Sequence, residues 1–140
     1  MLSIRDSELQ EIRAHGETTY PHECCGFLFG GLDGGKRRVD ALLSAENVHE
    51  ENHERRFLIT PKAYMLAERD ARARGQDIVG FYHSHPDHPA RPSQYDLDHA
   101  WPNLSYIIVS IQDGEAADLT SWVLADDRRG FNAEEIERIT

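Results

Sequence analysis

The stretch HSHPDHPARPSQYD, residues 83–96, places two histidines two positions apart and an aspartate eleven positions after the second. The run DIVGFYHSH (77–85) predicts a buried strand that turns polar at its C-terminal end. Side chains at positions i and i+2 of a strand share a face, so the imidazoles of His83 and His85 can converge on one point. Zinc binds imidazole nitrogen and carboxylate oxygen at about 2.0–2.2 Å. The stretch therefore offers His83, His85 and Asp96 as ligands of one zinc, with a fourth position left for water, as in catalytic sites.

Two other metal-binding patterns overlap with this stretch. Spelled H-x-H-x-D-H, residues 83–88 match the metal-binding string of the metallo-β-lactamase fold, which is longer than this chain and takes further histidine and aspartate ligands far downstream. Here His99 is the last histidine. A cupin site requires a glutamate a few residues after its H-x-H pair, and residues 86–95 contain none. Both patterns therefore lack ligands that their folds require.

The full string H-S-H-x(7)-S-x(2)-D, from His83 to Asp96, resembles the signature of the JAMM (MPN-plus) zinc metalloprotease family. Members of that family cleave peptide or isopeptide bonds next to ubiquitin-like proteins. The family also has a glutamate far upstream, at the start of its first strand, and PHECCGFLFGG offers Glu23 in that place. RRFLITPKAY (55–64) resembles the segment by which the family enters its second helix. The resemblance covers roughly residues 5–126, which is most of the chain.

The resemblance implies a role for five side chains: zinc ligands at His83, His85 and Asp96, a general base at Glu23, and a hydrogen-bond donor to the oxyanion at Ser93. Zinc lowers the pKa of a bound water to about 7, so hydroxide is available at neutral pH. The string S-x-x-D is also a capping box, in which Ser93 begins a helix. The two interpretations are compatible, because such a helix would present Asp96 in its first turn.

Three further polar side chains lie near the signature in the sequence. His88 belongs to the proline-rich connection 86–92 and is expected to face solvent, with a contact to substrate or metal as the open alternative. Asp98 and His99 are candidates for a second layer around the metal, because ligating histidines usually donate their other ring N–H to an acceptor. The residues alone do not decide these roles.

Composition restricts the class of protein. At 140 residues the chain has the length of one domain, and we expect residues 1–140 to form one. The net charge of −10 argues against nucleic acid as a partner, since phosphate binding relies on clustered lysine and arginine. No apolar run approaches the roughly 18 residues of a membrane span, and no signal stretch is evident, so no membrane is expected and the cytoplasm is the expected compartment. The adjacent Cys24 and Cys25 are expected to be reduced.

Turn and capping signals divide the chain into elements. The expected order is a helix over 3–16, a hairpin of 24–32 and 37–47, a strand over 54–60, a helix over 61–75, a strand over 77–85, a short helix over 93–101 and a hairpin of 104–112 and 117–126. The tail from residue 131 is undecided between helix and strand. This order predicts an α/β (α+β) fold with a mixed β-sheet flanked by helices, and the resemblance implies a cytidine-deaminase-like, JAMM metalloprotease core.

The predicted function is a zinc-dependent metallopeptidase that hydrolyses a peptide or isopeptide bond at the C-terminal tail of a small ubiquitin-like, sulfur-carrier protein. This prediction follows from the resemblance and from the short chain. An extended tail of this kind binds by adding a strand to an open sheet edge. Two alternatives remain: an interaction scaffold of the same fold that holds no metal, and an amidase acting on a small molecule. The oligomeric state is not predicted.

Overall fold

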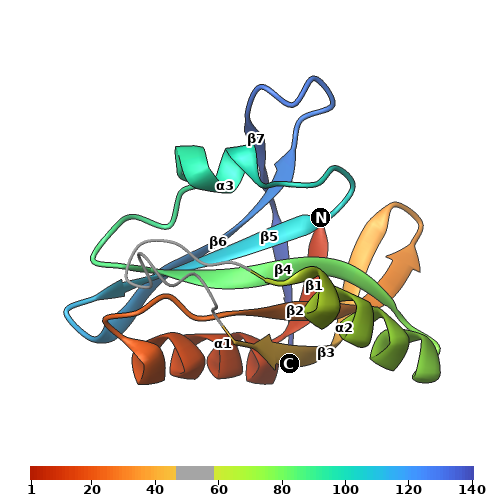
Figure 1. Cartoon of the computed structure of the whole chain (residues 1–140), viewed down its shortest axis with the longest axis horizontal. Helices are drawn as coiled ribbons and strands as arrows, with labels where there is room; N and C mark the ends of the chain where they lie inside the picture. The colour runs from red at the N-terminus through yellow and green to blue at the C-terminus, as the bar shows by residue number, and fades with distance from the viewer. Residues whose placement is uncertain (47–58) are drawn as a thin grey trace.

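The computed structural model describes residues 1–46 and 59–140, and within these ranges eight strands form a single sheet accompanied by three helices (Figure 1). The elements in chain order are β1 (Leu2–Arg5), α1 (Asp6–Thr19), β2 (Cys25–Asp33), β3 (Lys36–Ala45), α2 (Pro61–Ala73), β4 (Asp77–Pro86), α3 (Gln94–Asp98), β5 (Ser105–Gln112), β6 (Glu115–Leu124), β7 (Phe131–Glu134) and β8 (Ile136–Ile139). None of the helices in the described ranges is long and apolar enough to cross a membrane.

The strand order is β7-β6-β5-β4-β2-β3-β1-β8. Three neighbouring pairs run parallel, namely β4 with β5, β1 with β3 and β1 with β8, and the other pairs run antiparallel. The expected mixed sheet flanked by helices is therefore confirmed. The parallel β4–β5 pair lies in the middle of the sheet and carries the histidines of the signature at its C-terminal end.

The sheet curls until its two edge strands approach each other. Only Glu135 separates the edge strands β7 and β8 in the sequence, and its carbonyl accepts a hydrogen bond from Leu2 N at 2.9 Å. The side chain of Glu134 is 4% exposed and contacts Arg37 Nη1 of β3 at 3.3 Å. Its other oxygen accepts from Ser105 Oγ of β5 at 2.7 Å. This carboxylate thus joins strands from both halves of the sheet.

Hydrophobic side chains cover both faces of the central strands. On one face, α1 packs Leu9 and Ile12 into a cluster that includes Leu28 of β2. On the other face, α2 packs Ala71 into an aromatic cluster that includes Phe27. Figure 1 shows α1 along one side of the sheet and α3 on the opposite side. Strands covered on both faces are near-continuous apolar runs, which explains why β2, β4 and β5 were recognisable from the sequence.

The predicted N-terminal helix over 3–16 is wrong at both ends. The first residues form β1, because Leu2 and Ile4 are both fully buried and lie two positions apart, the period of a strand. The helix then continues past Gly16, which does not terminate it. A Cβ at Gly16 would lie 2.8 Å from Ile111 Cδ1, so this glycine allows α1 to approach β5 closely.

The other predicted elements, apart from the strand over 54–60, are confirmed with small shifts of their ends. Helix α2 begins as expected, with Pro61 at its first position and Thr60 Oγ1 accepting from Ala63 N at 3.1 Å. Gly75 follows the helix with φ +70°. Of the strand predicted over 54–60, residues 54–58 lie outside the described part of the chain, and the last two residues are not in a strand. The undecided tail forms β7 and β8.

Candidate metal centre

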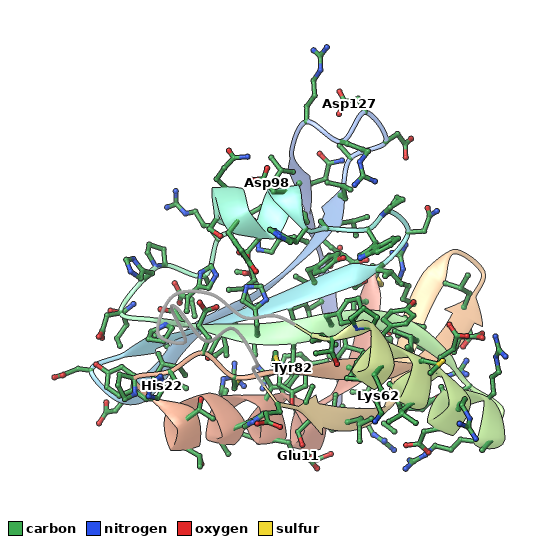
Figure 2. All side chains as sticks on the ribbon, in the orientation of Figure 1. Glu11, His22, Lys62, Tyr82, Asp98 and Asp127 are labelled. Atoms are coloured by element: carbon green, nitrogen blue, oxygen red, sulfur yellow. The ribbon has the colours of Figure 1, made fainter. Side chains whose placement is uncertain are left out.

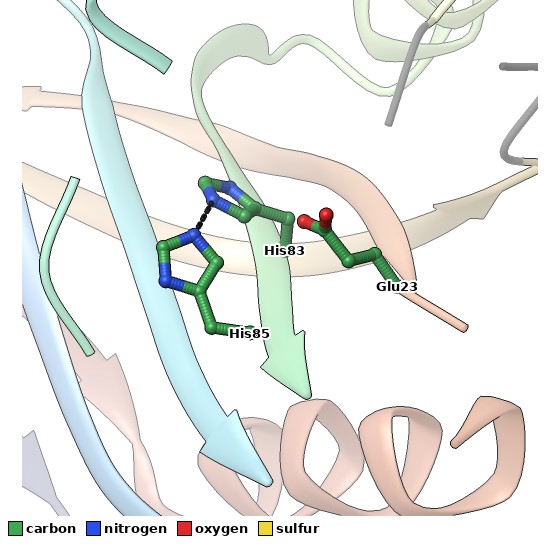
Figure 3. Close-up of side chains that lie close together, drawn as sticks. All are labelled: Glu23, His83 and His85. Atoms are coloured by element: carbon green, nitrogen blue, oxygen red, sulfur yellow. Dashed lines mark hydrogen bonds between the residues drawn. The ribbon is translucent and has the colours of Figure 1, made fainter. Parts of the chain in front are cut away.

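Strand β4 carries His83 and His85 on one face near its C-terminal end, and both side chains are buried. Glu23 comes from the segment just before β2. In the antiparallel β2–β4 pair Cys25 lies opposite His83. Glu23, two positions before Cys25, therefore lies at the level of His85, two positions after His83. Ser84 N also donates to Cys24 O at 3.2 Å, which extends the pairing beyond the strand. This register brings Glu23 beside both histidines, as Figure 3 shows.

Asp96 completes a triangle of donor atoms with the two histidines. Its Oδ2 lies 3.3 Å from His83 Nε2 and 3.1 Å from His85 Nε2, and the two Nε2 atoms are 3.1 Å apart. Ligands held tetrahedrally at about 2.0–2.1 Å from a zinc ion lie roughly 3.3 Å from one another. The triangle therefore has the size of one face of a zinc coordination tetrahedron, and the donor set of two imidazoles and one carboxylate fits that metal.

The tautomer of His85 strengthens the case for a cation. His85 Nδ1 lies 3.0 Å from Pro89 O, and a carbonyl oxygen only accepts, so Nδ1 carries the proton and Nε2 of the neutral ring presents its lone pair. That lone pair faces Asp96 Oδ2. Burial alone raises the pKa of Asp96, but the charge and hydrogen bonds of the two imidazoles in their protonated forms outweigh it and hold this pKa well below its usual range, so Asp96 is a carboxylate. A carboxylate oxygen and a ring lone pair this close repel each other unless positive charge, from a proton or from a metal ion, lies between them.

The cap of α3 orients Asp96. Ser93 N donates to Asp96 Oδ2 at 2.8 Å, and Asp96 N donates to Ser93 Oγ at 3.1 Å, which together form the predicted capping box. The box turns the carboxylate back toward the start of the helix, where β4 ends. Because Ser93 Oγ accepts from an amide, its own proton is left to donate elsewhere, and Ser93 lines the cavity beside the histidines. Capping and a role in the cavity are therefore compatible.

The carboxyl group of Glu23 is buried beside the triangle. Its exposed fraction is 2%, and one of its oxygens lies within 4.8 Å of a ring nitrogen of each histidine. Burial, and then the charge of Asp96, raise the pKa of Glu23 to about 9 in the metal-free chain. A divalent cation favours the ionised form of a nearby acid. Glu23 can therefore hold or release a proton at neutral pH, depending on whether the cation is bound.

A cavity of about 310 Å³ opens onto these groups. Its lining residues come from the segment before β2, the end of β4 and the connection that follows: Glu23, His85, Pro86, His88, Pro89, Arg91 and Ser93. The cavity brings the carboxyl group of Glu23, the ring of His85 and Ser93 together in one recess. His88 is exposed, as expected, and it also lines this cavity, where it could contact a substrate.

The hydrogen-bond partners behind the candidate ligands differ from the sequence-based expectation. The acceptor for His85 is the carbonyl of Pro89, and neither Asp98 nor His99 occupies that place. Asp98, labelled on α3 in Figure 2, accepts from Gln94 Nε2 at 2.8 Å. His99 Nδ1 lies 2.8 Å from a main-chain oxygen of the same helix. A backbone acceptor carries no residue-type signal, so the sequence could not reveal it.

The adjacent cysteines are not activated nucleophiles. Both are free and buried, as expected. Burial raises the pKa of Cys24 to about 11 and that of Cys25 to about 12. Reactive thiols need a lowered pKa, because the thiolate is the nucleophile. These two side chains therefore fill the core behind the site.

Known proteins resemble this chain in sequence and in fold. The model of the family described as prokaryotic homologs of the JAB domain matches residues 6–125. A desampylase of Haloferax volcanii is 36% identical over 107 residues, which are 76% of this chain and 75% of the relative. A probable TtuB-protein conjugate cleaving protease of Thermus thermophilus is 33% identical over 100 residues, 71% of this chain and 64% of the relative. A crystallised JAB1/MPN domain protein from Archaeoglobus fulgidus shows the same fold, with a TM-score of 0.62 at 21% identity over 100% of this chain and 98% of its own.

Proposed function

We infer that the chain, which belongs to the prokaryotic JAB-domain (JAMM) family, is a metal-dependent hydrolase of peptide or isopeptide bonds. A bound metal is inferred from the triangle of His83 Nε2, His85 Nε2 and Asp96 Oδ2, whose sides are 3.1–3.3 Å. We assign these three residues as ligands of a zinc ion. Glu23 is assigned as the general base and Ser93 as the oxyanion donor.

The mechanism assigns one task to each group in the cavity. Bound zinc supplies Lewis-acid activation of water and of the scissile carbonyl. The Glu23 carboxylate accepts one proton from the attacking water. As the carbon–nitrogen bond breaks, Glu23 gives that proton to the departing nitrogen, which leaves as an amine. The hydroxyl group of Ser93 donates a hydrogen bond to the carbonyl oxygen while negative charge develops there and keeps its proton, a contribution typically worth about 10²–10³ in rate.

We propose that the substrate is a conjugate or adduct at the C-terminal tail of a small ubiquitin-like protein of the sulfur-carrier type. The names of the two relatives support this class, since one is a desampylase and the other a probable protein-conjugate cleaving protease. The cavity suits a narrow chain end better than a folded surface, because its base and metal-binding face lie in a recess of about 310 Å³. Arg91 lines the cavity and supplies a positive charge that can meet a substrate carboxylate.

The experiment compares a ubiquitin-like carrier bearing one extra C-terminal amino acid with a short peptide that copies only its tail. We expect hydrolysis that is lost after metal chelation and restored by zinc. His83→Asn should abolish both zinc binding and hydrolysis. His99→Asn is the matched control, because its Nδ1 bonds to a main-chain oxygen of α3, and it should keep both. Hydrolysis that survives complete metal removal would refute the metal centre. Equal cleavage of carrier and tail peptide would refute recognition of the carrier.

A further inference from the structure

The loop of residues 87–92 connects the metal-binding strand to the start of α3, and three consecutive carbonyls within it accept hydrogen bonds from side chains. Pro89 O accepts from His85 Nδ1 at 3.0 Å. On either side of it, His88 O accepts from Ser110 Oγ of β5 and Ala90 O accepts from Thr120 Oγ1 of β6, both at 2.6 Å. The carbonyl that orients His85 is therefore held between two carbonyls that are attached to the sheet.

Both hydroxyls are aimed at the loop by a second hydrogen bond. Ser110 Oγ accepts from Gln112 Nε2 at 2.6 Å, and Thr120 Oγ1 accepts from Trp122 Nε1 at 2.8 Å. A hydroxyl has one proton, and an N–H donor already bound to its oxygen leaves that proton for the carbonyl. Chained hydrogen bonds of this kind also strengthen one another. The repeated arrangement on two neighbouring strands gives the loop two directed attachments, and Gln112 Nε2 adds a longer bond of its own to His88 O at 3.2 Å.

The loop itself supplies a hydrogen bond to one of these carbonyls, from Arg91 N to Pro89 O at 2.8 Å. Pro89 and Pro92 have no backbone N–H, so regular hydrogen bonding within the loop is limited. In the parallel β4–β5 pair Ser110 lies opposite His85, so the sheet register places the hydroxyl level with the metal-binding ring. A ligating histidine presents the correct nitrogen only if its other nitrogen has a fixed acceptor.

We propose that Ser110 and Thr120 are positioning residues of the metal centre. Their hydroxyls hold the loop so that Pro89 O selects the His85 tautomer with a free lone pair on Nε2. They also hold the C-terminal end of the loop, which leads directly to Ser93 in the lining of the cavity. The consequence for catalysis rests on the proposed metallopeptidase function. The tautomer of His85 is a property of the metal-free chain and does not depend on that function.

The test uses the variants Ser110→Ala, Thr120→Val and the two combined, with Thr120→Ser as the conservative replacement. Ser121→Ala is the matched control, because Ser121 is a buried serine on the same strand whose hydroxyl donates to Glu134 at 2.8 Å, away from the loop. Each protein is measured for thermal stability, zinc affinity, the visible spectrum of its Co²⁺ form, and the nitrogen chemical shifts of the His85 ring without metal at pH 8.

We expect the combined variant to bind zinc about 10–100-fold more weakly, as for other partners of ligating histidines, and to show an altered Co²⁺ spectrum. Thr120→Ser should bind zinc as the wild type does. Ser121→Ala should lower thermal stability and leave zinc affinity within about twofold. The inference is overturned if the combined variant keeps wild-type zinc affinity, or if Ser121→Ala loses as much zinc affinity as the combined variant does.

The metal-free measurement separates this inference from the proposed function. The wild-type His85 ring should show protonation at Nδ1, and the combined variant should shift toward a mixture of tautomers. If the wild type binds no zinc, the proposed function fails while this measurement still decides the role of the two hydroxyls. An unchanged ring spectrum in a folded combined variant would overturn that role whatever the metal data show.

Discussion

Replacing Glu23 with glutamine should have opposite effects on activity and on stability. The amide cannot accept a proton from water, and general bases typically contribute about 10²–10⁴ in rate, so kcat/KM should fall by that factor. Glutamine has nearly the shape of a protonated glutamic acid, so the cavity should keep its form. Zinc should still bind, since His83, His85 and Asp96 are unchanged.

The stability effect follows from the raised pKa. In the unfolded chain Glu23 titrates near 4.5, and in the folded metal-free chain near 9. Below pH 4.5 both states are protonated and the burial of Glu23 has no ionisation cost. Between 4.5 and 9 only the folded state keeps the proton, so folding stability falls as pH rises. At pH 7 the solution is 2.5 pH units above the pKa of 4.5, and each unit costs about 1.36 kcal/mol. The burial of Glu23 therefore lowers the free energy of unfolding by about 3 kcal/mol at pH 7.

Glutamine removes this cost because it does not titrate. Urea unfolding of the metal-free proteins should show Glu23→Gln more stable than wild type by about 3 kcal/mol at pH 7, with almost no difference near pH 4. Glu115→Gln, at an exposed position at the start of β6, serves as the control because it makes the same substitution outside the core. Zinc should shrink the gap by favouring the ionised wild-type carboxylate. A gap that stays constant between pH 4 and 7 would refute the reasoning, and wild-type activity in Glu23→Gln would refute the assigned base.

Three further changes test other parts of the site and its frame. Asp96→Asn removes the carboxylate from the ligand triangle and should weaken zinc binding by at least about 100-fold in a chelator competition; unchanged affinity would exclude it as a ligand. Arg91→Gln should raise KM roughly tenfold for a substrate whose leaving amino acid has a free carboxylate, and not for its amide, because a charge-assisted hydrogen bond is lost; equal effects on both substrates would contradict that contact. Gly26→Ala would place a Cβ 2.2–2.5 Å from ring atoms of Tyr82, so urea unfolding should show a loss of about 1–3 kcal/mol or more; a neutral result would mean that the ring can move aside.

Local signals accounted for most of the fold. The hairpin of β2 and β3 was predictable from the apolar run 24–32, the alternating run 37–47 and the Gly34–Gly35 turn, and α2 from Thr60 and Pro61. The prediction failed at the N-terminus, where Leu2 and Ile4 are buried by partners far along the chain. Strand β1 pairs with β3 and β8, and the pattern of four residues does not reveal partners at that sequence distance.

The sequence by itself determined which side chains can form the metal centre. The two-residue spacing of His83 and His85 on a strand and the three-residue spacing of Ser93 and Asp96 at a cap are local geometry, which short segments specify on their own. Only the tertiary structure decided that Glu23 reaches these ligands, and that hydroxyls of β5 and β6 hold the loop behind His85. Those contacts depend on the register between strands distant in the chain, which the burial of whole faces sets and no single segment encodes.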